Sequence, residues 1–182
     1  MKELGAGKRM EILFDADTIA KRNLELAHDI AALKLDHLLI VAVLKGSFVF
    51  AADLIRALHK VGLSPEVDFI SLSSYRSGTV SSGQVSILRD VESDVRNRHV
   101  LLVDDILESG RTIAYAKDLM AARGAASVRT CVLLDKPGHR AAEIEADFKG
   151  FDCPDLFVIG YGMDMAHSFR ELPFVGVVSK KD

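Results

Sequence analysis

The chain has 182 residues, 49% of them hydrophobic, and 23 Lys and Arg residues against 26 Asp and Glu residues give a formal net charge of -3. A chain of this length and apolar content can bury a core without disulfides or a structural metal, so we expect one domain over residues 1–182. The slight negative charge argues against nucleic acid as a main partner, and no apolar run reaches the roughly 20 residues of a membrane-spanning helix.

The first predicted element is an amphipathic helix over residues 18–34. Its apolar side chains recur at near-helical spacing, and Asp17 is suited to cap the first turn. The apolar positions are Ile19, Leu26, Ile30 and Leu33. The continuous apolar run LLIVAVL at 38–44 then predicts a buried strand, and Ser47 opens a second predicted helix at 47–62.

Two further strand candidates follow, VDFISL at 67–72 and VSIL at 85–88. The segment between them, from Ser73 to Gln84, is rich in Ser and Gly. Its length and composition predict a mobile loop or lid rather than a tight hairpin.

The remaining strand candidates are apolar runs, which are typical of a parallel sheet covered on both faces. They lie at 99–105, 127–134, 156–161 and 174–178. A third helix is expected between the first two, from Ser109-Gly110 to Arg123-Gly124. The recurring order of strand, helix and strand predicts an α/β fold with a mostly parallel twisted sheet flanked by helices. Ligands of such a fold gather beyond the carboxyl ends of the strands.

The chain contains two cysteines, Cys131 and Cys153. Each stands in an apolar or mixed stretch without a second thiol or a histidine at metal-ligand spacing. This usage predicts reduced thiols in a cytoplasmic protein.

The segment VLLVDDILESGRT, from Val100 to Thr112, carries the most specific chemistry. An apolar strand ends in the acids Asp104 and Asp105, and a short turn rich in hydrogen-bond donors leads into a helix. Free N–H groups at a helix start, hydroxyls and a glycine together form a cradle for a phosphate dianion. The cradle residues are Ser109, Gly110, Arg111 and Thr112. Carboxylates beside the cradle suit sugar hydroxyls or Mg²⁺, so the segment predicts a site for a ribose 5-phosphate.

Three other interpretations fit this segment less well. Acids at a strand end often only cap a helix or face solvent, but that does not account for the ESGRT that follows. The acidic pair also resembles the one that opens phosphoacceptor receiver domains, yet only 78 residues, 182 minus 104, follow Asp104. A P-loop is excluded because no GxxxxGK[ST] string occurs, and Gly160 to Gly162 lacks the third glycine of a dinucleotide fold.

VLLVDDILESGRT resembles the phosphoribosyl pyrophosphate motif of the type I phosphoribosyltransferases, and four further segments are similar to the hypoxanthine-guanine branch of that family. They are LKGS at 44–47, SSY at 73–75, LLDKP at 133–137, and FVIGYGMD at 157–164 with FREL at 169–172. Each string alone is weak evidence, whereas five in the family's order are specific. The resemblance implies the family's fold, with a small hood region and a flexible loop, and a homodimer or homotetramer.

The resemblance also implies a role for each segment. The 5-phosphate would be bound by Glu108, Ser109, Gly110, Arg111 and Thr112. The pyrophosphate would be bound by Leu44, Lys45, Gly46 and Arg170, with a cis peptide between Leu44 and Lys45. The flexible loop would begin at Ser74 and Tyr75.

The same resemblance assigns the purine and metal ligands and the catalytic residues. The purine would contact Lys136, Phe157, Val158 and Asp164. The metal ligands would be Asp104, Asp105 and Asp164. The catalytic residues would be Asp104, Asp105, Glu108 and Lys136, with Glu108 standing where most relatives have the shorter Asp. Leu156 and Met165 also depart from the family's common residues.

Several of these residues have a purely structural alternative. Lys45 could extend to solvent from a strand end, Lys136 could be a solvated lysine before Pro137, and Phe157 could belong to the core. His167 is expected to be a surface residue.

The resemblance implies a purine salvage enzyme that joins hypoxanthine or guanine to the ribose 5-phosphate of phosphoribosyl pyrophosphate. The products would be IMP or GMP and pyrophosphate, and Mg²⁺ would be the cofactor. Lys136 would donate a hydrogen bond to the purine O6, which selects a 6-oxo over a 6-amino base. The main alternative is a regulatory relative that senses nucleotides and binds RNA or DNA, because a shared fold does not establish activity. A pyrimidine- or adenine-specific transferase is opposed by LLDKP and FVIGYGMD.

Overall fold

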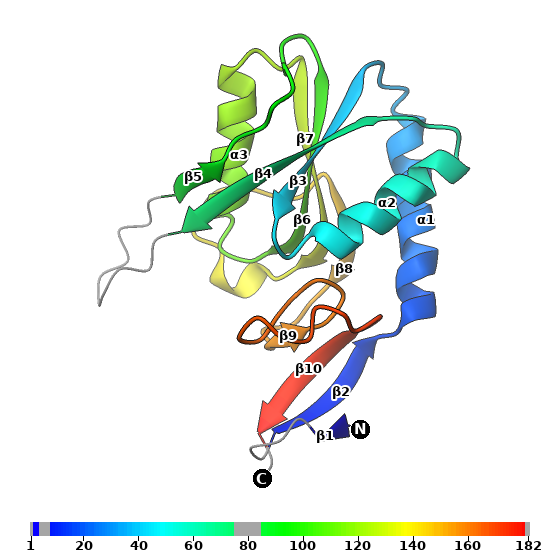
Figure 1. The fold of residues 1–182 in the computed structure, drawn as a ribbon, viewed down its shortest axis with the longest axis vertical. Coiled ribbons are helices and arrows are strands. Elements are labelled where there is room, and N and C mark those ends of the chain that lie inside the picture. Colours follow the sequence, from blue (N-terminus) through cyan, green and yellow to red (C-terminus); the bar gives the residue numbers. More distant parts are fainter. Residues whose placement is uncertain (1, 4–7, 75–84, 181–182) are drawn as a thin grey trace.

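The computed structural model describes residues 2–3, 8–74 and 85–180. Its centre is a six-stranded sheet in the order β5-β4-β3-β6-β7-β8 (Figure 1). Five neighbouring strands run parallel, and β5 pairs antiparallel with β4 at one edge. The strands are β3 (Leu38–Leu44), β4 (Glu66–Ser74), β5 (Val85–Arg89), β6 (His99–Leu107), β7 (Ser127–Asp135) and β8 (Phe148–Asp152). The predicted α/β fold with a mostly parallel sheet is confirmed.

Helices cover both faces of this sheet. Figure 1 shows α1 (Ala16–Ala32) and α2 (Phe48–Lys60) on one side and α3 (Arg111–Ala122) on the other. Alternate residues of β3 therefore enter two separate cores: Ile40 packs with α1 and α2, and Val41 packs with α3. This burial on both faces explains why β3 reads as a continuous apolar run.

A second, four-stranded sheet forms a hood beyond the carboxyl ends of the parallel strands (Figure 1). Its order is β1-β2-β10-β9, and all its pairs are antiparallel. The strands are β1 (Lys2–Glu3), β2 (Lys8–Phe14), β9 (Val158–Ile159) and β10 (Val175–Lys180). Strands from opposite ends of the chain thus build the hood, with Met10 opposite Val178.

Three local predictions differ from the structure. The cap of α1 is Asp15 rather than Asp17, because Asp15 Oδ1 accepts a hydrogen bond from the Thr18 amide at 2.8 Å. The strand predicted at 156–161 is confined to β9, since Gly160, Tyr161 and Gly162 have φ angles of +92°, +49° and +100°. Such left-handed residues cannot continue an extended strand. The strand predicted at 174–178 belongs to the hood and not to the parallel sheet.

The predicted loop from Ser73 to Gln84 is only partly described. Ser73 and Ser74 end β4, and residues 75–84, which include Tyr75, lie outside the described residues. No helix in the described part of the chain is long and apolar enough to cross a membrane.

Candidate active site

A cavity of about 690 Å³ lies where the carboxyl ends of the central strands meet the hood. The eight residues predicted for the pyrophosphate and the purine all line it, together with the predicted catalytic residues Asp105 and Glu108. The eight are Leu44, Lys45, Gly46, Lys136, Phe157, Val158, Asp164 and Arg170. The cavity therefore brings together residues from β3, β6, β7 and the hood that are far apart in the sequence.

The predicted phosphate cradle lies at the turn between β6 and α3. Gly110 caps α3 with a φ of +78°, and no side chain fills the capping position. The first N–H groups of a helix have no partner within it, so they remain available to an anion. They border a smaller hollow of about 200 Å³, which also contacts Asp104, Glu108, Ser109 and Thr112. Arg111 is exposed and does not line it.

The segment that follows β7, at residues 136–147, packs against this cradle and is hydrogen-bonded to it. The amides of Ala141 and Ala142 donate hydrogen bonds to the Ser109 carbonyl at 2.9 and 3.1 Å. A Cβ on Gly110 would lie 2.6 Å from Ile144 Cγ2, so this position requires glycine for space as well as for its φ angle.

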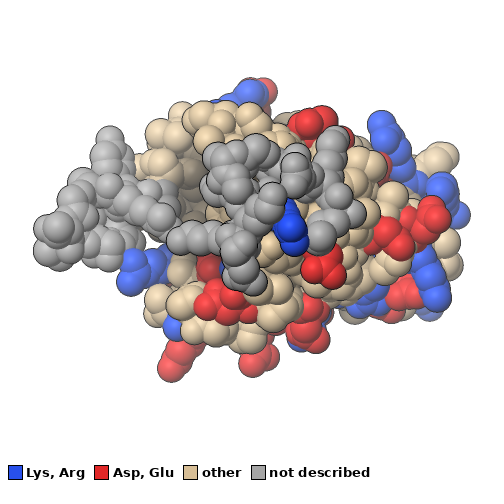
Figure 2. Space-filling view, turned by 90° about the horizontal axis from the view of Figure 1, so that it is seen from below, with Lys and Arg blue, Asp and Glu red and all other residues tan. Residues whose placement is uncertain are grey.

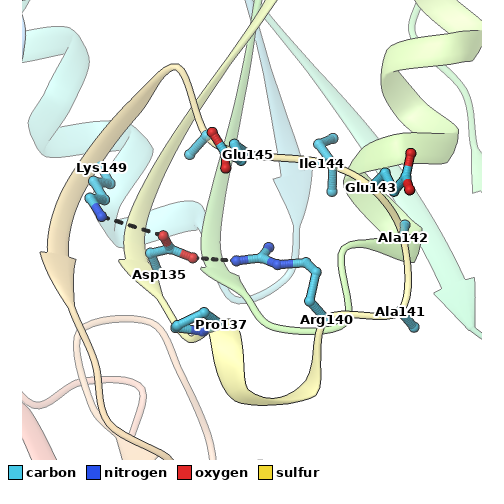
Figure 3. Close-up of a pocket in the computed structure, with 10 residues that line it drawn as sticks. Asp135, Pro137, Arg140, Ala141, Ala142, Glu143, Ile144, Glu145 and Lys149 are labelled. Carbon is cyan, nitrogen blue, oxygen red and sulfur yellow. Dashed lines mark hydrogen bonds and ion pairs between the residues drawn. The ribbon is translucent and has the colours of Figure 1, made fainter.

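A separate cavity of about 780 Å³ adjoins the same supporting segment. Figure 3 shows Arg140 reaching across it to Asp135, which Lys149 approaches from the other side. Charges of both signs line this cavity, including Glu143 and Glu145. Both of its bases, Arg140 and Lys149, form ion pairs with Asp135, and Lys149 is the one residue of β8 that lines it.

Asp104 and Asp105 stand side by side at the end of β6. Asp104 is only 7% exposed, and its Oδ1 accepts a hydrogen bond from the Asp105 amide at 2.9 Å. Burial, followed by the negative charge of Asp105, raises the pKa of Asp104 well above its usual value. Asp105 packs on the pyrophosphate loop, because a Cβ on Gly46 would lie 1.8 Å from Asp105 Oδ2. Neither carboxylate forms an ion pair with any described Lys or Arg.

Replacing Asp104 by Asn is expected to stabilise the metal-free protein at neutral pH. A raised pKa means that the wild-type fold loses stability as the pH rises through it, and Asn removes that buried charge. Relief of such strain at a functional site is worth about 1 kcal/mol, or a rise in Tm of about 2–4 °C. Thermal unfolding in EDTA would show this rise at neutral pH and its disappearance at acid pH, where wild-type Asp104 is protonated.

The exposed helix residue Asp118 provides the control for that experiment, because Asp118→Asn removes one negative charge without relieving a buried one. A Tm of Asp104→Asn below that of the wild type at neutral pH would contradict the prediction.

Lys136 and Glu108 form an ion pair that faces the main cavity. Lys136 is 8% exposed, and its Nζ lies 2.9 Å from Glu108 Oε1 and 3.8 Å from Asp155 Oδ1. The Lys136 amide also donates to the Leu107 carbonyl at 2.9 Å, which holds the end of β7 beside the end of β6. A solvated lysine does not fit this burial, so the ammonium is placed to meet a ligand in the cavity.

A further polar pair lies beside Lys136. His139 Nε2 lies 2.9 Å from Asp155 Oδ2, and ligand atoms of Glu108, His139 and Asp155 lie within 4.8 Å of one another. Among the described residues, these three are the acids and histidines that lie close enough together to bind one metal ion. The Lys136 ammonium already supplies a positive charge to this group. The predicted metal ligands Asp104, Asp105 and Asp164 do not form such a group.

The predicted pyrophosphate loop follows β3. The peptide between Leu44 and Lys45 is cis, as the resemblance implies, and Lys45 is exposed at the cavity. Ser47 is fully buried and its hydroxyl donates to the Val43 carbonyl at 2.6 Å, so it anchors the loop.

Asp164 and Arg170 face the same cavity from the hood. Arg170 forms an ion pair with Asp164 Oδ1 at 2.8 Å, and the other oxygen of Asp164 accepts from the His167 amide at 2.7 Å. His167 is exposed, as predicted, yet it also borders the cavity. Because His167 stands between Asp164 and Arg170 in the sequence, it could have been predicted as a site residue.

Apolar side chains complete the cavity. Phe157 is 55% exposed and is therefore not a core residue. Ile106, Leu156 and Leu88 line the cavity beside it and were not predicted as site residues. The sequence does not distinguish these residues from core residues, because a single apolar side chain in a strand or loop usually indicates burial in the core. An exposed aromatic ring with apolar neighbours suits a flat heterocyclic base.

Charge on the described surface is mixed. Figure 2 shows acidic and basic side chains interspersed on the face seen from below, without a continuous basic stripe on that face. This distribution agrees with the formal net charge of -3. It gives no support to a polyanion-binding surface on this face.

Comparisons with known proteins agree with this geometry. A family model described as the phosphoribosyl transferase domain matches residues 10–166. The chain is 41% identical over 169 residues to hypoxanthine-guanine phosphoribosyltransferase of Bacillus subtilis, covering 92% of each protein. It is 46% identical over 165 residues to the Leishmania donovani enzyme of the same name, covering 89% of this chain and 78% of that one.

A solved structure gives the same result. The crystal structure of a hypoxanthine phosphoribosyltransferase from Staphylococcus aureus superimposes with a TM-score of 0.87 at 37% identity. The match covers 93% of this chain and 91% of that one.

Proposed function

Because the chain belongs to the phosphoribosyltransferase family, we propose that its main cavity transfers the ribose 5-phosphate of phosphoribosyl pyrophosphate to a 6-oxopurine. The protein is a purine salvage phosphoribosyltransferase that converts hypoxanthine or guanine to IMP or GMP and releases pyrophosphate. The observation that carries the proposal is the ion pair between the buried Lys136 and the partly exposed Glu108, which faces the cavity beside the phosphate cradle. The alternative of a nucleic-acid-binding regulatory protein receives no support from these relatives.

The nucleotide would lie across three neighbouring parts of the site. Its 5-phosphate would accept hydrogen bonds from the start of α3, at Ser109 to Thr112, where the helix dipole also favours a negative charge. Asp104 and Asp105 would accept hydrogen bonds from the ribose hydroxyls. Ile106 and Glu108 line both the small hollow and the main cavity, so the nucleotide would extend along a path from the first into the second.

The base would be recognised by residues at the far end of that path. The Lys136 ammonium would donate to the purine O6, and Glu108 would take or give the proton at N7. The exposed ring of Phe157 would stack on the base, and the Val158 carbonyl would accept from its opposite edge. An ammonium group cannot accept a hydrogen bond, so a 6-amino base would be disfavoured.

The acids fit a hard divalent cation such as Mg²⁺. Asp104 and Asp105 are adjacent carboxylates, one of them buried, without an ion-pair partner in the described chain. Asp164 has one oxygen on Arg170, but a carboxylate has further lone pairs for a ligand. Asp104 and Asp105 would thus hold one Mg²⁺ and Asp164 a second, and these ions when bound would neutralise charge on the departing pyrophosphate.

The chain's own residues would then support displacement at ribose C1. Lys45, Gly46 and Arg170 would bind the pyrophosphate oxygens as the bond to C1 breaks. The carboxylates of Asp104 and Asp105 would face the positive charge that develops on the sugar. Glu108 would manage the purine proton as the new bond to C1 forms.

A cytoplasmic location is part of this proposal. Cys131 and Cys153 are both free and buried, which supports a reducing compartment. Burial raises the pKa of each thiol, so neither is activated for reaction.

Purified protein is expected to form IMP from hypoxanthine or GMP from guanine when phosphoribosyl pyrophosphate and Mg²⁺ are supplied. Separate reactions with xanthine, adenine and uracil, analysed by chromatography, define the base preference. We expect uracil to give no product and adenine to react far more slowly than the preferred 6-oxopurine. EDTA should stop the reaction and added Mg²⁺ should restore it. A well-folded protein that converts neither hypoxanthine nor guanine would refute the proposed function.

A further inference from the structure

The buried hydroxyl of Tyr161 joins three segments of the chain. It donates a hydrogen bond to Asp53 Oδ2 on α2 at 2.7 Å and accepts one from Asn23 Nδ2 on α1 at 2.9 Å. The Tyr161 side chain is 4% exposed. Burial, followed by the Asp53 carboxylate, raises the pKa of Tyr161, so its hydroxyl retains the proton that it donates.

The backbone at Tyr161 is in an unusual conformation. Its φ angle of +49° lies between those of Gly160 and Gly162, at +92° and +100°. The Tyr161 amide donates to the Leu172 carbonyl at 2.8 Å, and the Gly162 amide donates to the Arg170 carbonyl at 3.0 Å. A tyrosine is uncommon in the left-handed region, so the contacts around it must hold it in that conformation.

The turn at 160–162 contacts both parts of the predicted pyrophosphate site. A Cβ on Gly162 would lie 2.2 Å from the Gly46 carbonyl oxygen, so the turn packs directly on the loop after β3. On its other side, Arg170 Nη1 donates to the Gly162 carbonyl at 2.6 Å. Asp53 lies on α2, which begins at Phe48 directly after the same loop.

We propose that Tyr161 is a positioning residue that fixes the 160–162 turn onto α2 and so sets the spacing between Lys45-Gly46 and Arg170. This inference rests on the proposed function of the site. Without the hydroxyl, the hydrogen bonds that join the 160–162 turn to α1 and α2 would be lost. The distance between Lys45-Gly46 and Arg170 would then no longer be fixed. Lys136 and Glu108, which are proposed to contact the base, follow β7 and β6 and lie outside this network. The other proposed base contacts, Phe157 and Val158, stand just before the turn in the sequence.

Tyr161→Phe removes the hydroxyl and keeps the ring. Small displacements of positioned groups cost up to about a hundredfold, so we expect the KM for phosphoribosyl pyrophosphate to rise about ten- to a hundredfold. The KM for hypoxanthine should rise much less, because the Lys136–Glu108 pair lies outside this network. Titration calorimetry with pyrophosphate and Mg²⁺ should show the same loss of affinity without any turnover. Tyr115→Phe is the matched control, because Tyr115 lies on α3 across the sheet and is not part of this network.

A merely structural role would give a different pattern. Tyr161→Phe would then lower the Tm and the active fraction, while both KM values and the calorimetric affinity stayed at wild-type values, and this result would overturn the inference. Asp53→Asn, which retains an acceptor oxygen, should preserve the KM for phosphoribosyl pyrophosphate better than Asp53→Ala does. This pair keeps the test available if Tyr161→Phe does not fold.

A double mutant tests whether Tyr161 and Asp53 act through the same hydrogen bond. If Tyr161 and Asp53 act through one hydrogen bond, Tyr161→Phe combined with Asp53→Ala should be no worse than the more damaging single change. Strictly additive losses would contradict a shared anchor. A wild-type protein that makes no nucleotide would refute the proposed function instead, whereas an active wild type with an unaltered Tyr161→Phe refutes only this inference.

Discussion

Lys136→Met is expected to lower kcat/KM for hypoxanthine and guanine by about ten- to a hundredfold, as for loss of one charge-assisted hydrogen bond of about 1.5–3 kcal/mol. Methionine keeps most of the length and apolar contact of the lysine stem but removes the donor proposed for the purine O6. The KM for phosphoribosyl pyrophosphate and the Tm should change little, because the Lys136 ammonium faces the cavity rather than the core. Steady-state kinetics with each substrate varied in turn would measure both effects.

The control for this experiment is Lys149→Met. Lys149 also forms ion pairs with acids at a strand end, Asp135 and Asp152, but it lines the other cavity and not the proposed active site. Its replacement should leave kcat/KM unaltered. Wild-type kcat/KM in Lys136→Met with both 6-oxopurines would remove Lys136 from the base site.

Glu108→Gln is expected to reduce kcat by about a hundredfold or more, as for loss of a general base. Glutamine keeps the size and an acceptor oxygen but cannot take up the N7 proton. Binding of phosphoribosyl pyrophosphate should be nearly unchanged, because the cradle offers backbone N–H groups from the start of α3. Glu108→Asp should retain activity, since a carboxylate is kept.

A pH profile distinguishes proton transfer from packing at Glu108. The matched control is Glu143→Gln, which neutralises an exposed acid that lines the other cavity. Equal activity of Glu108→Gln and wild type across the pH range would mean that the N7 proton passes elsewhere, for example directly to water. Glu108 would then act only near the helix start, where a negative charge favours the helix dipole.

The central sheet was predictable because its strands are buried on both faces. Runs such as 38–44 and 99–105 need no tertiary information to be recognised, and β3 has the predicted bounds. The hood was less predictable. In β2 the buried Met10 is followed by the exposed Glu11 and Ile12, so no strict alternation marks the strand, and its partner β10 lies at the opposite end of the chain. Strand β9 contains only two residues, because the left-handed turn at 160–162 follows it.

The candidate site was likewise only partly predictable from the sequence. The turn from Asp104 to Thr112 was predictable, because contiguous residues carry the whole chemical pattern. The pyrophosphate and purine residues were found through resemblance, and the cavity brings all eight of them together. The His139–Asp155 pair and the Tyr161 network were not predicted. Their members are distant in sequence, so only the fold places them in contact.

A crystal structure of the protein with IMP and Mg²⁺ would test the proposed function most directly. We expect the 5-phosphate on the turn at 108–112 and the ribose hydroxyls at Asp104 and Asp105. The base should lie against Phe157, with its O6 about 3 Å from Lys136 Nζ. IMP bound elsewhere, for instance in the cavity between Asp135 and Glu145, or with its base turned away from Lys136, would show that the proposed binding mode is wrong.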